Sequence, residues 1–145
     1  MPVKSDPGGF PQRKAAELPA VTAAQMRQIQ GVAQEEYGFD IIQMLENGGR
    51  AVAMLALEML GGRGRGQRVA VLAGGGNKGA TGMCAARSLA NWGFNVIPVL
   101  AEVEGEMSLV AQRQVQILRS AGIVEPESET ATEYDVEELL AAASL

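Results

Sequence analysis

The feature that most constrains the fold is a short apolar run that ends in a cluster of glycines. The run Arg68–Ala73 is rich in aliphatic residues, which is typical of a strand covered on both faces. The glycine-rich segment Gly74–Gly82 follows, then a helical pattern over Met83–Trp92 and a second strand-like run, Phe94–Leu100. A strand, a helix and a strand within about 30 residues form a βαβ unit. We therefore expect an α/β domain with parallel strands and a right-handed crossover.

Helical patterns also precede this unit. Thr22 and Gln25 fit a capping box at the start of a helix that should stop at Gly38. Asp40 is expected to cap a second helix, in which the pair Gly48–Gly49 favours either a bound ligand or close helix packing. The apolar residues of this second helix, which we expect to be mostly buried, are Ile41, Ile42, Met44, Leu45, Val52, Leu55, Ala56, Met59 and Leu60.

Three further elements are expected after the unit. A helix should run from Ser108 to about Ser120 and stop at Gly122, and a very short strand should follow at Ile123–Val124. The segment Glu125–Glu138 holds seven acidic residues and no basic one, so we interpret it as a solvated loop and helix face. A last short helix is expected over Glu133–Ala143.

Length and charge limit the organisation and the partners. A chain of 145 residues is one domain by length, and we expect a mobile tail over 1–20, where four of the six prolines lie, followed by a domain over 21–145. The net charge of −5 disfavours a nucleic-acid partner. No run of about 18 apolar residues spans a membrane, and the first residues lack the apolar core of a secretory signal, so we expect a cytoplasmic protein.

Two features of the composition limit the chemistry. The chain has no histidine, which excludes catalytic systems that depend on His and the usual zinc sites. Its one cysteine, Cys84, can form neither an internal disulfide nor a thiolate cluster, and we expect it to pack as a small apolar side chain. Acid or base chemistry is left to carboxylates, Lys or Tyr.

The glycine-rich segment is the candidate nucleotide-binding site. Glycines let backbone amides approach a ligand closely, and the start of the following helix, expected near Gly82, adds unpaired amides and a positive dipole end. Lys78 adds a full positive charge, so a phosphate should be favoured here. The candidate binding residues are Gly74, Gly75, Gly76, Asn77, Lys78, Gly79, Ala80 and Thr81.

Two general phosphate-binding motifs compete for this segment. Gly74, Gly76 and Gly79 match the G-x-G-x-x-G dinucleotide fingerprint, and Glu102 lies where it could accept a ribose hydroxyl. Against this match, the span from Gly74 to Gly82 is longer than that tight turn needs. The P-loop pattern fails, because Ala80 stands where its lysine belongs.

The sequence also resembles a specific family at three ordered places. Val71–Leu89 resembles the segment of the YjeF N-terminal domain family, the NAD(P)H-hydrate epimerases, in which G-P-G-N-N-G-G-D-G precedes a helix of the form L-V-A-A-R-x-L. Leu18–Arg27 is similar to the family's opening segment, and Met44–Val52 is similar to its M-E-N-A-G-R-A-V helix. The resemblance implies a Rossmann-like three-layer αβα domain with a mainly parallel sheet, often dimeric. It also implies an isomerase that interconverts the two epimers of hydrated NAD(P)H.

The resemblance has departures that bear on the site. Asn77 keeps the first loop asparagine, which the resemblance assigns to substrate contact, whereas Lys78 stands where the family has a second asparagine that helps to bind potassium. Thr81 replaces the loop aspartate and Ala80 replaces a glycine. A positive charge gained and a carboxylate lost should favour an anion and disfavour potassium, so no cofactor is assigned.

The catalytic residue is not found in the sequence. The resemblance places the acid/base aspartate in a strand of the form V-V-D-A-x-x-G-x-G, which has no match here, so we expect a sheet that is incomplete on its C-terminal side. The chain is then a fragment, a protein completed by another chain, or a reduced homologue, and a homodimer or a chain that completes the sheet is the expected partner. The expected function is NADHX/NADPHX epimerisation as part of such a domain; the alternative is a catalytically degenerate nucleotide-binding or protein-interaction module.

Overall fold

The computed structural model describes residues 14, 17–62 and 64–124. The chain divides into two compact units, Met1–Asp40 and Ile41–Leu145, and each is described by itself. Most of the expected tail over 1–20, the acidic segment 125–138 and the expected last helix lie outside the described residues.

The first unit contains helix α1, Ala23–Glu35. Both halves of the expected capping box are present: the Gln25 amide donates to Thr22 Oγ1 at 3.2 Å, and the Thr22 amide donates to Gln25 Oε1 at 2.8 Å. Gly38 follows the helix with a φ of +68°, a conformation that favours glycine. The expected start and stop of this helix are confirmed.

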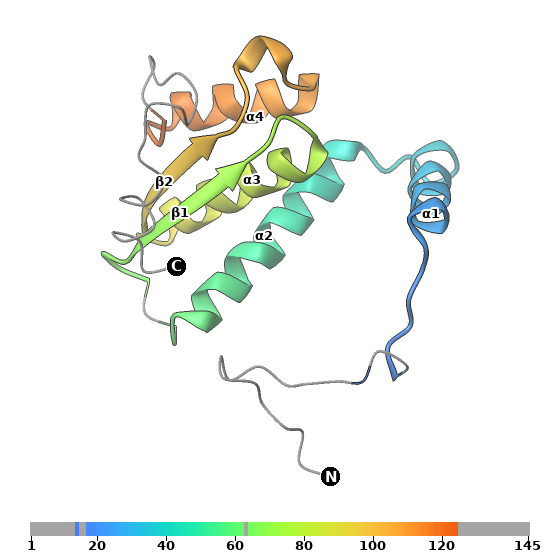
Figure 1. Ribbon diagram of the computed structural model, residues 1–145, viewed down its shortest axis with the longest axis horizontal. Coiled ribbons are helices and arrows are strands. Elements are labelled where there is room, and N and C mark those ends of the chain that lie inside the picture. The colour runs from blue at the N-terminus through green and yellow to red at the C-terminus, as the bar shows by residue number, and fades with distance from the viewer. Residues whose placement is uncertain (1–13, 15–16, 63, 125–145) are drawn as a thin grey trace. The chain divides into compact units, whose positions relative to one another are not determined.

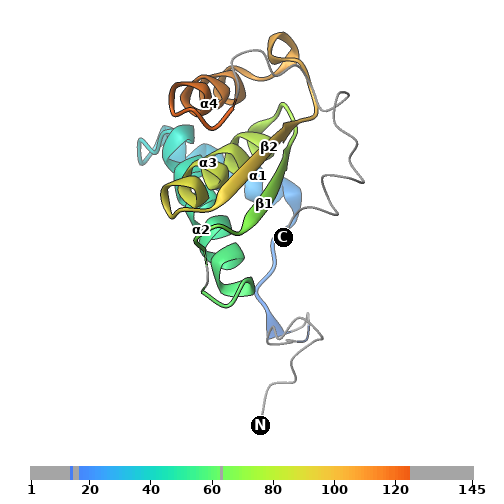
Figure 2. The same ribbon diagram turned by 90° about the vertical axis from the view of Figure 1, so that its left-hand side faces the viewer.

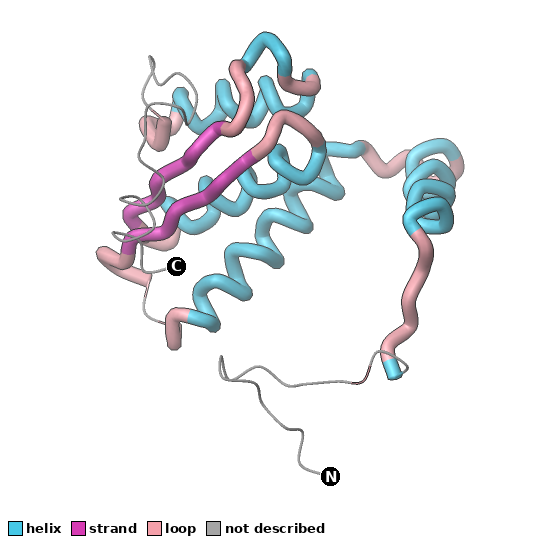
Figure 3. The backbone as a smooth tube through the Cα atoms, viewed as in Figure 1, coloured by secondary structure: helices cyan, strands magenta, loops and turns pink. Residues whose placement is uncertain are grey.

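The second unit is built on a parallel pair of strands, β1 (Arg68–Ala73) and β2 (Asn95–Leu100). Their register runs from Arg68 opposite Asn95 to Ala73 opposite Leu100. Figure 3 shows the two strands side by side in magenta. Helix α3, Asn77–Asn91, connects the strands and packs against both. The expected βαβ unit and its parallel sheet are confirmed.

Two more helices lie beside α3. Helix α2 (Ile41–Met59) packs along one side of it and α4 (Leu109–Ser120) along the other, after the short 3₁₀ helix η2, Glu104–Glu106 (Figures 1 and 2). Ser108 caps α4 by accepting a hydrogen bond from the Ala111 amide at 3.3 Å. The main core cluster lies between these helices and the sheet, and its fully buried members include Ala80, Met83, Cys84, Ala86, Ala111, Val115 and Leu118.

The start of α3 differs from the expectation. The helix begins at Asn77 with Gly76 as its N-cap, six residues before Met83, the expected start. Glycine usually disfavours a helix interior, but Gly79 lies in the first turn because the Gly74 backbone approaches it closely. The loop after β1 is therefore only Gly74–Gly76, and the objection that the segment is too long for a tight phosphate turn no longer holds.

Two other expectations are wrong. Val52, Leu55 and Met59 on α2 are about half exposed, because only one stripe of this helix packs on α3. Ile123–Val124 forms a bend and not a strand: Gly122 turns the chain with a φ of +67°, and Val124 packs into the core. No helix among the described residues combines the length and the apolar character needed to cross a membrane.

Candidate nucleotide-binding site

Two glycines of the turn from β1 into α3, Gly79 and Gly76, have opposite surroundings. A Cβ built on Gly79 would lie 1.6 Å from the carbonyl oxygen of Gly74, so only glycine lets the helix pack against the end of the strand. A Cβ built on Gly76 would meet no atom within 4 Å. The motif glycines thus place the helix start directly after the strand and leave open space in front of Gly76, as the dinucleotide fingerprint requires.

The first turn of α3 presents unpaired backbone donors. The first amide that the helix pairs internally is that of Ala80, which donates to the Gly76 carbonyl at 2.9 Å. The amides of Gly76, Asn77, Lys78 and Gly79 have no hydrogen-bond acceptor in the described part of the chain, and Gly76 has no side chain to act as a cap. Such a helix start carries partial positive charge and suits an anion.

The candidate residues do not all reach the surface. Gly76, Asn77 and Lys78 are exposed, whereas Gly75 and Ala80 are buried. The candidate residues that a ligand can contact from solvent are therefore a small exposed group at the start of α3. Sequence alone could not separate the exposed from the buried members, because that separation depends on where the helix begins.

Thr81 takes part in the local structure of the helix. Its hydroxyl donates to the carbonyl of Asn77 at 3.0 Å, one turn earlier. Its methyl group lies against α2, where a Cβ on Gly48 would be 3.1 Å away. Thr81 therefore joins α2 to the first turn of α3.

The loop is also held by the segment after β2. The Gly75 amide donates to Glu102 Oε1 at 3.0 Å, and the Ser108 amide donates to the Gly75 carbonyl at 2.8 Å. The sequence had suggested Glu102 as a residue near the ligand, but it gave no signal for Ser108, because the contact is made by the Ser108 backbone. These bonds fix the turn on which the helix start depends.

The pair Gly48–Gly49 is explained by helix packing at Gly49. A Cβ on Gly49 would lie 2.4 Å from Cys84 Cβ, 2.8 Å from the Thr81 carbonyl oxygen and 2.9 Å from the Ala85 nitrogen. The backbone of α3 thus fills the space that a side chain would need. Of the two interpretations left open by the sequence, close packing is the one that the structure supports here.

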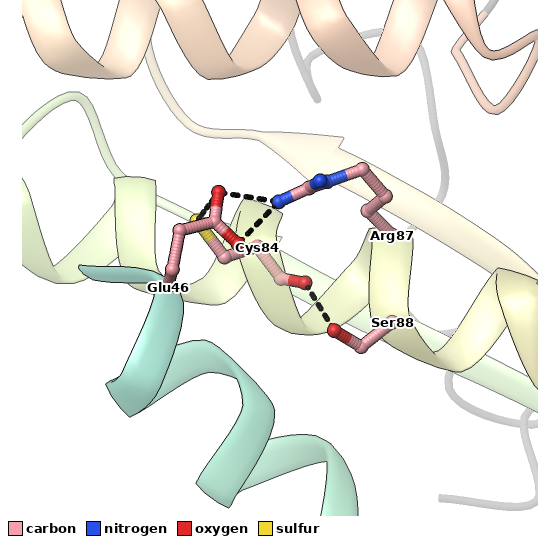
Figure 4. Close-up of polar contacts among 4 residues, drawn as sticks. All are labelled: Glu46, Cys84, Arg87 and Ser88. Atoms are coloured by element: carbon pink, nitrogen blue, oxygen red, sulfur yellow. Dashed lines mark hydrogen bonds and ion pairs between the residues drawn. The ribbon is translucent and has the colours of Figure 1, made fainter. Parts of the chain in front are cut away.

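An ion pair links the same two helices (Figure 4). Arg87 on α3 forms a salt bridge with the Glu46 carboxylate on α2, and Cys84 Sγ donates to Glu46 Oε1 at 3.7 Å. Burial raises the pKa of the Cys84 thiol to about 11, and Glu46 adds to the shift while Arg87 opposes it. The hydrogen bond that Arg87 donates to Glu46 raises the pKa of Arg87 in turn. Cys84 is fully buried, which confirms its expected role as a packed side chain.

Glu46 and Arg87 belong to two of the family-like segments, the M-E-N-A-G-R-A-V helix and the helix after the glycine loop. Their contact was not expected from the sequence, although both lie in the segments that carried the resemblance. The signal that could have suggested it is one acidic side chain in the first segment and one basic side chain in the second, each next to apolar residues that are expected to pack.

Comparison with known proteins matches these features. The family model of the YjeF-related protein N-terminus matches residues 41–140. An NAD(P)H-hydrate epimerase of Dehalogenimonas lykanthroporepellens is 40% identical over 129 residues, which are 88% of this chain and 52% of that protein. Another, of Rhodopirellula baltica, is 34% identical over 107 residues, which are 74% of this chain and 42% of that protein.

A solved structure agrees with the sequence matches. The crystal structure of yeast ynu0, YNL200c, superposes with a TM-score of 0.72 at 25% identity, covering 85% of this chain and 51% of that one. The chain therefore spans about half the length of the relatives it matches. With the βαβ unit, the glycine turn and these matches in agreement, the chain belongs to the family of the YjeF-related protein N-terminus.

Proposed function

We propose that this chain is the nucleotide-holding part of an NAD(P)H-hydrate epimerase, which interconverts the two epimers of hydrated NADH or NADPH. The names of the relatives and the family match support this activity. The relatives extend beyond the portion that this chain matches, so the assignment to this chain rests on its own site.

One observation carries the proposal: the first amides of α3 have no acceptor in the described part of the chain, and a Cβ built on Gly76 would meet no atom within 4 Å. A diphosphate accepts hydrogen bonds from such amides and gains from the helix dipole. The exposed ammonium of Lys78 in the same turn adds attraction for any phosphate. We assign substrate contact to Gly76, Asn77 and Lys78, and a supporting role to Gly74, Gly75, Gly79, Ala80 and Thr81.

The residues of this turn do not fit the potassium ion that the family resemblance implies. Lys78 presents a cation where the family has an amide oxygen, and Thr81 presents a neutral hydroxyl where the family has a carboxylate. We therefore derive no step of the reaction through a metal ion.

The relatives contain a second half that this chain does not match. We propose that this second half, on the same polypeptide or on another, is the partner of the chain. Leu72 on β1 is 60% exposed, and β1 pairs only with β2 among the described strands. An unpaired strand edge next to exposed apolar side chains suits an added strand. We propose that this added portion brings the acid/base group.

The test is an assay of epimer interconversion. Purified single epimers of hydrated NADH are incubated with the 145-residue chain, alone and mixed with a chain that carries the second half of the Dehalogenimonas epimerase. The two epimers are separated by chromatography over time. We expect conversion above the spontaneous rate in the mixture and not with either chain alone.

A control variant makes the test specific to the turn. Gly76→Leu fills the open space in front of the amides and should abolish conversion in the mixture. If the mixture of wild-type chains forms a complex but gives no conversion, the epimerase assignment is wrong and a degenerate binding module replaces it. If Gly76→Leu converts as fast as the wild-type chain, the reaction does not use this turn.

A further inference from the structure

The Glu102 carboxylate lies at the entrance of the glycine turn. Its Oε1 accepts from the Gly75 amide at 3.0 Å, and a Cβ built on Gly75 would be 2.2 Å from Oε2. The carboxylate therefore fills the place that a side chain at position 75 would take. Glycine is needed at position 75 for Glu102 to approach, and not for a ligand.

This contact leaves one carboxylate oxygen available. Oε1 is used by Gly75, whereas Oε2 has no hydrogen-bond partner among the described residues. The side chain is exposed, so a ligand in the turn can reach it. An ionised carboxylate oxygen accepts hydrogen bonds and donates none.

The position of Glu102 relative to the open amides limits which part of a nucleotide it can meet. Gly75 directly precedes Gly76, the first residue with an open amide, and consecutive Cα atoms are about 3.8 Å apart. A phosphate on those amides therefore has its attached ribose within reach of Oε2. A ribose hydroxyl there would donate to the carboxylate, whereas a phosphate on the ribose would face its negative charge.

We propose that Glu102 makes this site select the dinucleotide with a free ribose 2′-hydroxyl, so that hydrated NADH is preferred to hydrated NADPH. The inference rests on the proposed function, because it takes the diphosphate to bind at the start of α3. Glu102 has two separable roles in it. Its oxygen atoms hold the turn through Gly75, and its charge repels a 2′-phosphate.

Lys78 carries the opposite charge to Glu102, and it acts on the ligand in a different way. It lies in the first turn of α3 and attracts every phosphate group of a ligand. Removing its charge should weaken the binding of all phosphorylated ligands together. The preference for a ligand with a free 2′-hydroxyl over one with a 2′-phosphate should come from the charge of Glu102.

The experiment measures the affinity of the 145-residue chain for ADP-ribose and for 2′-phospho-ADP-ribose by calorimetry at low salt. We expect ADP-ribose to bind about tenfold more tightly, since a carboxylate about 4 Å from a phosphate carrying one to two charges is repelled appreciably even in water. Glu102→Gln keeps an oxygen for Gly75 and removes the charge. It should bring the two affinities within about twofold of each other, because the repulsion of the 2′-phosphate is lost and the amide nitrogen in the place of Oε2 cannot accept from a ribose hydroxyl.

Three other variants separate charge from structure. Glu102→Ala removes both roles, so both ligands should bind several-fold more weakly than to Glu102→Gln. Glu106→Gln removes an exposed carboxylate from the same segment and should keep the wild-type preference. Lys78→Gln should weaken both ligands and leave ADP-ribose the more tightly bound of the two.

The outcomes distinguish the two levels of the proposal. If the wild-type chain binds both ligands equally, or prefers the 2′-phosphate, or if Glu102→Gln keeps the preference, the inference about Glu102 is overturned while nucleotide binding stands. If the wild-type chain binds neither ligand, the proposed nucleotide site is wrong and the inference about Glu102 is overturned with it.

Discussion

The first turn and the middle of α3 are built on opposite principles. In the middle, Met83, Cys84 and Ala86 are fully buried, and the backbone of α2 comes so close that Gly49 has no space for a side chain. In the first turn the backbone amides of Gly76, Asn77 and Lys78 have no acceptor among the described residues, and these three residues are exposed. The middle of α3 thus packs in the core, whereas its start presents polar backbone groups. Glycine permits close helix packing at Gly49 and leaves space beside the backbone at Gly76.

The largest expected effect is at the junction of the two regions. Gly79→Ala places a Cβ 1.6 Å from the Gly74 carbonyl oxygen, so the turn or the helix must move. We expect the free energy of unfolding to fall by about 3 kcal/mol or more, measured by urea denaturation. Gly82→Ala, in the same helix and with ordinary contacts, is the control and should be neutral or stabilising. Equal effects of the two substitutions would contradict the close packing of the helix on the strand end.

The packing of the middle of α3 on α2 can be tested by substitutions at two neighbouring glycines of α2. Gly49→Ala would bring a Cβ within 2.4 Å of Cys84 Cβ and should lower the free energy of unfolding by about 2 kcal/mol. Gly48→Ala meets only a Thr81 methyl group at 3.1 Å and should cost less than about 1 kcal/mol. Thermal unfolding of the two variants checks the difference, and a reversed order would show that α2 packs on α3 in another register.

The buried thiol should make the middle of α3 sensitive to alkaline pH. Because the pKa of Cys84 rises from 9.0 to about 11 on folding, the folded state keeps its proton where the unfolded state loses it. The contribution to stability is complete below pH 9 and is lost as the pH rises through about 11, an effect of about 1–2 kcal/mol. Cys84→Ala should remove this part of the decline in urea denaturation measured from pH 8 to 11. An identical decline in both proteins would assign it to other groups.

The smallest expected effect concerns the ion pair of Figure 4. The side chains of Arg87 and Glu46 are 28% and 40% exposed, so solvent screens their attraction. A double-mutant cycle with Arg87→Met and Glu46→Gln should give a coupling energy of about 1 kcal/mol that falls with added salt. A coupling near zero would mean that glycine packing, and not charge, holds the two helices together.

The sequence was informative where local chemistry decides the structure. The capping box at Thr22, the limits of β1 and the stops at Gly38 and Gly122 follow from backbone preferences of single residues, and the structure has them as expected. The start of α3 was misplaced because it depends on contacts between the helix and the end of β1. Gly79 would break an isolated helix, yet here it permits the approach of Gly74.

The sequence indicates the segment that holds the candidate site, but it does not show which residues of that segment are exposed. The glycines and Lys78 favour a phosphate at this turn, which stays a prediction, and the family resemblance covers the same segment. The buried position of Ala80, the anchoring of Gly75 by Glu102 and the contact between Glu46 and Arg87 each join residues distant in sequence. No local pattern encodes such contacts, so only the folded chain shows which amides stay open.

The most direct test of the central claim is to observe those amides while a ligand binds. The ¹⁵N-labelled 145-residue chain is titrated with ADP-ribose, and the amide resonances are followed by nuclear magnetic resonance. The account requires the largest shifts at Gly76, Asn77, Lys78 and Gly79, with little change at Cys84 in the middle of the helix. Saturable binding with unshifted resonances in this turn, or with the largest shifts elsewhere on the chain, would contradict it.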